Sequence, residues 1–370
     1  MTKEKQVQKS GDNSNQVQID TVVNVNGVSE ERVREIIAEV SQRAIQDQTQ
    51  EANEIFLKRV DKFTDLLLPR IESIEKKFES FQEPDFQVLL KKAQISAGCS
   101  DRELDYGVLS ELLVHRVKHK SNIKKKASIA KAVEIINQID NDALCGLTMY
   151  VAITKFSPTS GVATKGLSVI NSLYGKLLYE ELPSNKEWID NLDILGVITT
   201  SAAGYRKTYN DFICQAWEGY LLPGLKKDSE EYKKAIDLLK SAKVTNQVLI
   251  ENEFDSNYVK LPFLRKEYIT KVNPTIDVNI GGVWYPLQAS FTEEQKEVLS
   301  QIWDMYTNDV DATNNIKNKF IELLYSFDKI KKVSYWWDNI GTMFNVNSIG
   351  RIIGHTNAKN YDPTIPDIDD

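Results

Sequence analysis

Three side chains in the middle of the chain have the types and the spacing of a metal site. Glu111, His115 and His119 follow one another at intervals of four residues, so a helix would present them on one face. Carboxylate and imidazole groups are common ligands of divalent metals. Basic residues between 116 and 120 would repel a cation at the same end of that helix. We therefore expect no metal and no cofactor, with these three residues as the candidates to test.

Basic residues are concentrated in the stretch 115–131, which indicates a possible anion-binding corner between two helices. Its candidate residues are Arg116, Lys118, Lys120, Lys124, Lys125 and Lys126. No aromatic residue is interleaved there as a stacking platform. Such a run is also typical of a solvated loop, and both interpretations stay open. The net charge of −7 argues against bulk binding of nucleic acid.

Motifs for covalent or phosphate chemistry are absent from the sequence. It contains no G-x-S-x-G, no H-E-x-x-H and no G-x-x-x-x-G-K-[ST]. We therefore expect no enzymatic activity and name no catalytic residue. The three cysteines are widely spaced without a C-x-x-C pair, which favours a reducing cytoplasm. No apolar run is long enough to cross a bilayer, and the N-terminus is not a secretory signal.

The elements that would position these residues begin with a β segment at 1–28. From Gln16 the segment alternates, which predicts a strand. An isolated strand needs a partner edge, and amide side chains on one face can stack between copies of a chain. The predicted self-assembly residues of this strand are Val17, Ile19, Val23, Asn24 and Val25. A loose N-terminal tail and an edge strand docked on the body are the alternatives.

A long amphipathic helix is predicted over 29–82, with a break at Pro69. Its apolar stripe extends from Val33 to Phe81 and includes Phe56 and Phe63. This stripe would pack either on another copy of the chain, with both phenylalanines at the interface, or back on its own domain.

The rest of the chain is predicted to be mainly helical. We expect a helical domain over 83–250, a small β-hairpin insert over 251–291 and a C-terminal helical region over 292–370 with an extended acidic tail. The hairpin is predicted from two alternating runs that flank Gly281-Gly282. The fold class is therefore mainly α: a helical bundle with a long N-terminal amphipathic helix, an N-terminal assembly strand and a small late hairpin.

Several segments resemble an uncharacterised bacterial family that joins a G-D-N-S-x-N-x-Q β motif to a helical domain. The matching segments are Gly11-Asp12-Asn13-Ser14-Asn15-Gln16, Asn26-Gly27-Val28-Ser29, Phe81-Gln82-Glu83-Pro84-Asp85-Phe86-Gln87, Leu109 to Arg116, and Ile349-Gly350-Arg351-Ile352-Ile353-Gly354-His355-Thr356-Asn357-Ala358. The N-terminal motif is also similar to bacterial amyloid-signalling motifs.

Together these patterns predict a non-enzymatic, self-associating cytoplasmic protein. The first expected partner is a second copy of the chain, in a homo-oligomer. The resemblance implies a sensor or effector in bacterial antiphage defence, for which the partner would be a phage component or another defence protein. The alternative function is binding of a nucleotide or nucleic acid at the 115–131 corner.

Overall fold

The computed structural model describes residues 29–44, 50–201 and 204–368. Fourteen α-helices and seven short strands occur in these ranges, so the mainly α fold class is confirmed. The predicted strand within 1–28 lies outside the described residues. None of the described helices combines the length and the apolar character needed to cross a membrane.

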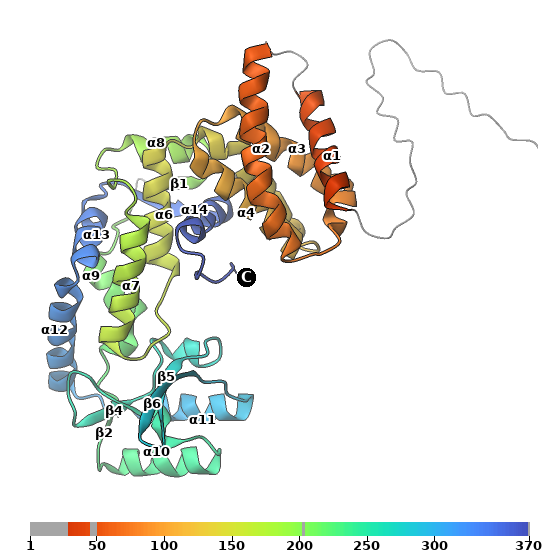
Figure 1. Ribbon diagram of the computed structural model, residues 1–370. Helices are drawn as coiled ribbons and strands as arrows, with labels where there is room; N and C mark the ends of the chain where they lie inside the picture. The colour runs from red at the N-terminus through yellow and green to blue at the C-terminus, as the bar shows by residue number, and fades with distance from the viewer. Residues whose placement is uncertain (1–28, 45–49, 202–203, 369–370) are drawn as a thin grey trace, which may run out of the picture.

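The N-terminal part of the described chain consists of α1 (Glu30–Ala44) and α2 (Gln50–Glu72), which both pack on α3 (Pro84–Cys99). Arg34 of α1 forms an ion pair of 3.5 Å with Asp65 of α2. In one straight helix these residues would be about 46 Å apart. The prediction of a single long helix is therefore wrong, because the segment folds back on itself (Figure 1). Pro69 lies inside α2 and does not interrupt it.

The main helical body is built around α14 (Ser348–Tyr361), which packs on α4, α5 and α6 (Figure 1). Gly354 permits the close approach of α14 to α6, since a Cβ atom there would lie 2.7 Å from Val151 Cγ2. The other helices of this body are α4 (Glu103–Lys118), α5 (Ile123–Ile135), α6 (Asn141–Lys155), α7 (Ala163–Leu177), α8 (Glu187–Ile194), α9 (Tyr209–Ala216), α12 (Val310–Ser326) and α13 (Asp328–Asn339). Strands β1 (Ile198–Ser201) and β7 (Met343–Val346) pair antiparallel within it.

A smaller unit has a hydrophobic core of its own, with members from Leu225 to Trp303. Its elements are β2 (Leu225–Lys226), α10 (Glu230–Ser241), β3 (Ile250–Glu251), β4 (Tyr258–Lys260), β5 (Thr275–Ile280), β6 (Val283–Gln288) and α11 (Glu293–Trp303). Strands β2, β4 and β3 form one small sheet in that order. The predicted insert at 251–291 is thus part of a larger unit that also contains α10 and α11.

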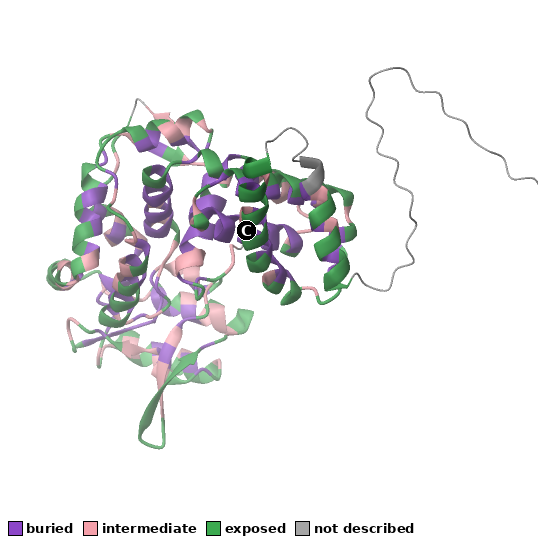
Figure 2. Ribbon diagram, turned by 45° about the horizontal axis from the view of Figure 1, so that its top comes forward, coloured by how far each residue is buried: buried purple, intermediate pink, exposed green. Residues whose placement is uncertain are grey.

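The predicted hairpin is confirmed as β5 and β6. Gly281 and Gly282 form its turn with φ of +62° and +89°, as a two-residue hairpin turn requires. The register pairs Ile280 with Val283 and Val278 with Tyr285, so these four apolar side chains share one face of the hairpin. Every residue of β6 is exposed, and the hairpin projects from the molecule (Figure 2).

Candidate binding site

A cavity of about 820 Å³ lies between α5, the C-terminal end of α6, α7, α14 and the segment after α14. Residues three or four positions apart on a helix share one face, and several lining residues follow this spacing. Ser348, Arg351 and His355 occupy successive turns on one face of α14, and all three line the cavity. Lys124 and Ser128 do the same on α5. The Ser128 and Ser348 hydroxyl oxygens are 3.0 Å apart, which holds the two helices together at the edge of the cavity.

Four cations line this cavity: Lys124, Lys125, Lys155 and Arg351. Lys124, Lys155 and Arg351 are exposed and have no ion-pair partner among the described residues. The Lys125 ammonium lies 3.5 Å from the Ile368 carbonyl oxygen, to which it donates a hydrogen bond. Two carboxylates also line the cavity, and both are already paired with lysines outside the lining: Asp362 with Lys176, and Asp367 with Lys118 and Lys359. The three exposed cations therefore remain without a partner among the described protein groups.

Two helix N-termini add to this positive potential. Helix α5 begins at Ile123, just before Lys124, and α14 begins at Ser348 in the cavity lining. Asn122 and Asn347 cap these helices by accepting hydrogen bonds from backbone N–H groups of the first turn. The aligned peptide dipoles leave partial positive charge at both ends, which favours a nearby anion.

The remaining basic residues of the predicted corner do not line the cavity, and each is held in an ion pair. Arg116 is buried and binds Glu83 at 3.1 Å and Asp85 at 2.6 Å. Lys126 also binds Asp85, at 3.1 Å. The hydrogen bond from Arg116, more than that from Lys126, lowers the pKa of the Asp85 carboxyl. These contacts fix α4 and α5 to the start of α3.

Two further corner lysines, which do not line the cavity themselves, also form ion pairs. Lys120 binds Glu75 at 2.9 Å, and Lys118 binds Asp367. Of the six predicted anion-binding residues, the structure thus places only Lys124 and Lys125 in the cavity. Lys155 and Arg351 were missed by sequence reasoning, although the spacing of Ser348, Arg351 and His355 on a predicted helix was a usable signal.

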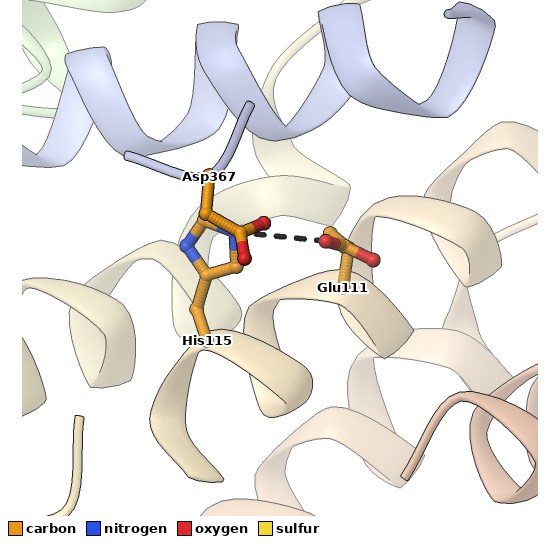
Figure 3. A group of neighbouring side chains, drawn as sticks. All are labelled: Glu111, His115 and Asp367. Atoms are coloured by element: carbon orange, nitrogen blue, oxygen red, sulfur yellow. Dashed lines mark ion pairs between the residues drawn. The ribbon is translucent and has the colours of Figure 1, made fainter. Parts of the chain in front are cut away.

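The predicted metal ligands are only partly brought together. Glu111 and His115 lie on α4 beside Asp367, and their ligand atoms are within 4.8 Å of one another (Figure 3). His119 follows the end of α4 and is not a member of this group. The Lys359 ammonium lies 3.0 Å from a Glu111 oxygen and also pairs with Asp367. A side-chain cation thus takes the position between the carboxylates that a metal ion would need.

The titration behaviour of Glu111 follows from these charges. Burial alone would raise the pKa of its carboxyl, but contacts with His115 and Lys359 outweigh burial and lower the pKa to about 2. Arg70 adds a third contact, at 3.5 Å. Glu111 is therefore an ionised structural group near neutral pH.

Residues 27–365 match the model of a protein family whose description, ":-like", states no activity and no ligand. The chain belongs to this family. No curated protein and no solved structure matches the chain. The resemblance to an uncharacterised family is confirmed for most of the chain. The G-D-N-S-x-N-x-Q motif lies before the matched residues and outside the described ones.

The predicted self-assembly residues fall into two groups. Val17, Ile19, Val23, Asn24 and Val25 lie outside the described residues. Phe56 and Phe63 are 4% and 0% exposed within the single chain. Phe56 packs against Gly98 of α3, and Phe63 belongs to the main core. Neither ring is available to a second copy in this fold, because the stripe of α2 is already covered by its own chain.

Proposed function

We propose that this protein is a binding protein for a phosphate-bearing ligand, held in the cavity between α5, α7 and α14. The observation that carries the proposal is the convergence of Lys124, Lys155 and Arg351 without ion-pair partners among the described residues. Cations from three separate helices are gathered at one concave surface, where their mutual repulsion is relieved when an anion binds. The cavity volume of about 820 Å³ is within the range of small-molecule sites.

Isothermal titration calorimetry with ATP and with inorganic phosphate, at low and high salt, tests this function. We expect binding that weakens as salt rises, because salt screens contacts between exposed charges. Lys124→Ala and Arg351→Ala should each weaken binding by about tenfold, the value of one charge-assisted hydrogen bond.

Lys131→Ala is the matched control, since Lys131 is an exposed lysine of α5 that pairs with Glu134 and does not line the cavity. It should bind as the parent does. If the parent binds no phosphate-bearing compound at low salt, or if all three variants weaken binding equally, the proposed function fails.

Self-association is a second candidate function, and the hairpin favours it. Its apolar face includes Ile280, Val283, Tyr285 and Leu287, which are 63%, 52%, 51% and 54% exposed. A contiguous apolar surface of this kind is typical of an interaction site, and an identical face on a second copy would match it in a symmetric dimer. A role in antiphage defence rests on the family resemblance alone.

Light scattering tests the second function. Tyr285→Ser with Leu287→Ser should reduce the mass of an assembly formed through the hairpin, whereas Val310→Ser, at an apolar position of α12 that is 68% exposed, should not. Ile19→Lys with Val23→Lys tests the N-terminal segment in the same way. A parent protein with the mass of a single chain at all concentrations would contradict self-association.

A further inference from the structure

The cavity has two walls of opposite character. Its cations come from α5, the end of α6 and the first turns of α14. The second wall is largely apolar and includes Val169 and Leu173 of α7 together with Ile365 and Pro366 of the segment after α14. Two carboxylates of that segment, Asp362 and Asp367, also line the cavity, but lysines outside the lining neutralise them. Val169 is 62% exposed, so this wall has uncovered apolar surface. A ligand that matches both walls needs a charged end and an apolar end.

The buried part of the lining includes a histidine. His355 is 5% exposed, lines the cavity, and its Nδ1 atom has no hydrogen-bond partner among the described residues. The three unpaired cations, Lys124, Lys155 and Arg351, are all exposed, so they form the rim of the cavity.

The lining lacks the groups that usually hold a nucleobase. Among the described residues, Phe156 is the only one that brings a six-membered aromatic ring to the lining, and the centre of this ring already lies 5.5 Å from that of the His355 ring in an edge contact. No asparagine or glutamine among the described residues lines the cavity, so no amide is placed to bond to the edge of a base. Branched aliphatic side chains form most of the apolar surface instead.

We propose that the ligand is an anionic amphiphile: its phosphate or similar head group binds Lys124, Lys155 and Arg351, and its aliphatic chain lies along Val169 and Ile365. This inference rests on the proposed function, since it specifies the ligand class of the same cavity. Burial of the chain supplies affinity in proportion to the apolar surface covered, and the rim cations fix the direction in which the ligand lies.

Calorimetric titration of the full chain with octyl phosphate, octanol, inorganic phosphate and ATP tests the ligand class. Octyl phosphate should bind at least about tenfold more tightly than inorganic phosphate, because burial of only two methylene groups would account for that factor. Octanol shares the chain but has no charge, so it should bind more weakly than octyl phosphate. Arg351→Ala should weaken octyl phosphate and inorganic phosphate together.

Val169→Asp separates the two walls. It should weaken octyl phosphate by about tenfold or more, and by more than it weakens inorganic phosphate, because the new charge repels both anions and only octyl phosphate also loses an apolar contact. Val88→Asp is the matched control, because Val88 of α3 is 60% exposed and does not line the cavity. If octyl phosphate and inorganic phosphate bind with equal affinity, and Arg351→Ala abolishes both, the ligand is not an amphiphile. The proposed function, binding of a phosphate-bearing ligand, would still hold. If ATP binds more tightly than octyl phosphate, and Val169→Asp does not change its affinity, the ligand class is a nucleotide and not an amphiphile. Absence of binding by every phosphate compound would overturn both the amphiphile and the proposed function.

Discussion

At the scale of single residues, Lys359 decides what the cluster of Glu111, His115 and Asp367 is. The buried Glu111 carboxylate needs a compensating cation, and the Lys359 ammonium contacts both Glu111 and the partly exposed Asp367. Sequence spacing identified Glu111 and His115 correctly as neighbours. It could not find Lys359 or Asp367, because α14 and the segment after it approach α4 only in the folded chain.

Substitution of Lys359 tests whether its ammonium group takes the place of a metal ion beside Glu111 and Asp367. Lys359→Met leaves a buried carboxylate less compensated, which should cost about 3 kcal/mol of unfolding free energy. Because the cation has gone, Zn²⁺ should raise the melting temperature of Lys359→Met and leave that of the parent unchanged. Differential scanning fluorimetry with and without Zn²⁺ measures both effects. Equal stabilisation of parent and variant would show that Lys359 does not replace a metal ion.

The pKa of Glu111 gives a second prediction at this scale. Folding lowers this pKa from 4.5 to about 2, so the ionised carboxylate stabilises the fold above pH 4.5, and this contribution is lost as the pH falls toward 2. Glu111→Gln should flatten the dependence of unfolding free energy on pH in that window. The exposed Glu294→Gln should leave it as in the parent. An unchanged slope in Glu111→Gln would contradict the assignment.

At the scale of elements, the sequence predicts which side chains form an apolar stripe along a helix, but it does not predict which element that stripe packs against. The stripe from Val33 to Phe81 is compatible with one long helix or with two shorter ones, because both bury the same side chains. The hairpin was predicted more completely, since alternation and Gly281-Gly282 fix both its strands and its turn. The acidic segment after α14 was expected to be an extended, mobile tail, whereas its described residues pack on the body: Ile365 is buried and Asp367 is paired with two lysines.

The packing of α2 within its own chain predicts how its core responds to mutation. Phe63→Ala should lower the unfolding free energy by about 3–5 kcal/mol, the usual cost of a deleted core phenylalanine. Oligomer mass should stay the same, because the ring contacts only its own chain. Leu66→Ala, on the same helix but 41% exposed, is the control and should cost much less. A loss of mass before a loss of stability would place α2 between copies.

At the scale of the whole molecule, the two hydrophobic cores meet near Lys260. This β4 residue is 2% exposed, and its ammonium donates a hydrogen bond of 2.7 Å to the Gly219 carbonyl oxygen. It also lies 5.6 Å from the centre of the Tyr220 ring. Burial lowers the pKa of Lys260 to about 7, although Glu253 opposes the shift. Sequence patterns gave no sign of this junction, since a lone lysine in a short strand usually faces water.

The buried Lys260 predicts that stability rises with pH. Between pH 7 and 10.5 the unfolded chain holds a proton that the folded chain has lost, so unfolding becomes less favourable as the pH increases. Urea unfolding at pH 7 and pH 9 should show this rise in the parent and not in Lys260→Met. The exposed Lys240→Met should behave as the parent does. A parent whose stability falls over this range would contradict the prediction.

The central place of α14 has a consequence for how the protein is made. Asn357 donates a hydrogen bond to Thr148, which precedes it by 209 residues. At a synthesis rate of about 5–20 residues per second, α4, α5 and α6 leave the ribosome about 10–40 s before their partner exists. During that interval, the apolar surfaces of α4, α5 and α6 that pack against α14 in the folded protein lack this partner. The nascent chain should therefore need a chaperone to reach its native state, and production should improve when trigger factor or an Hsp70 system is supplied.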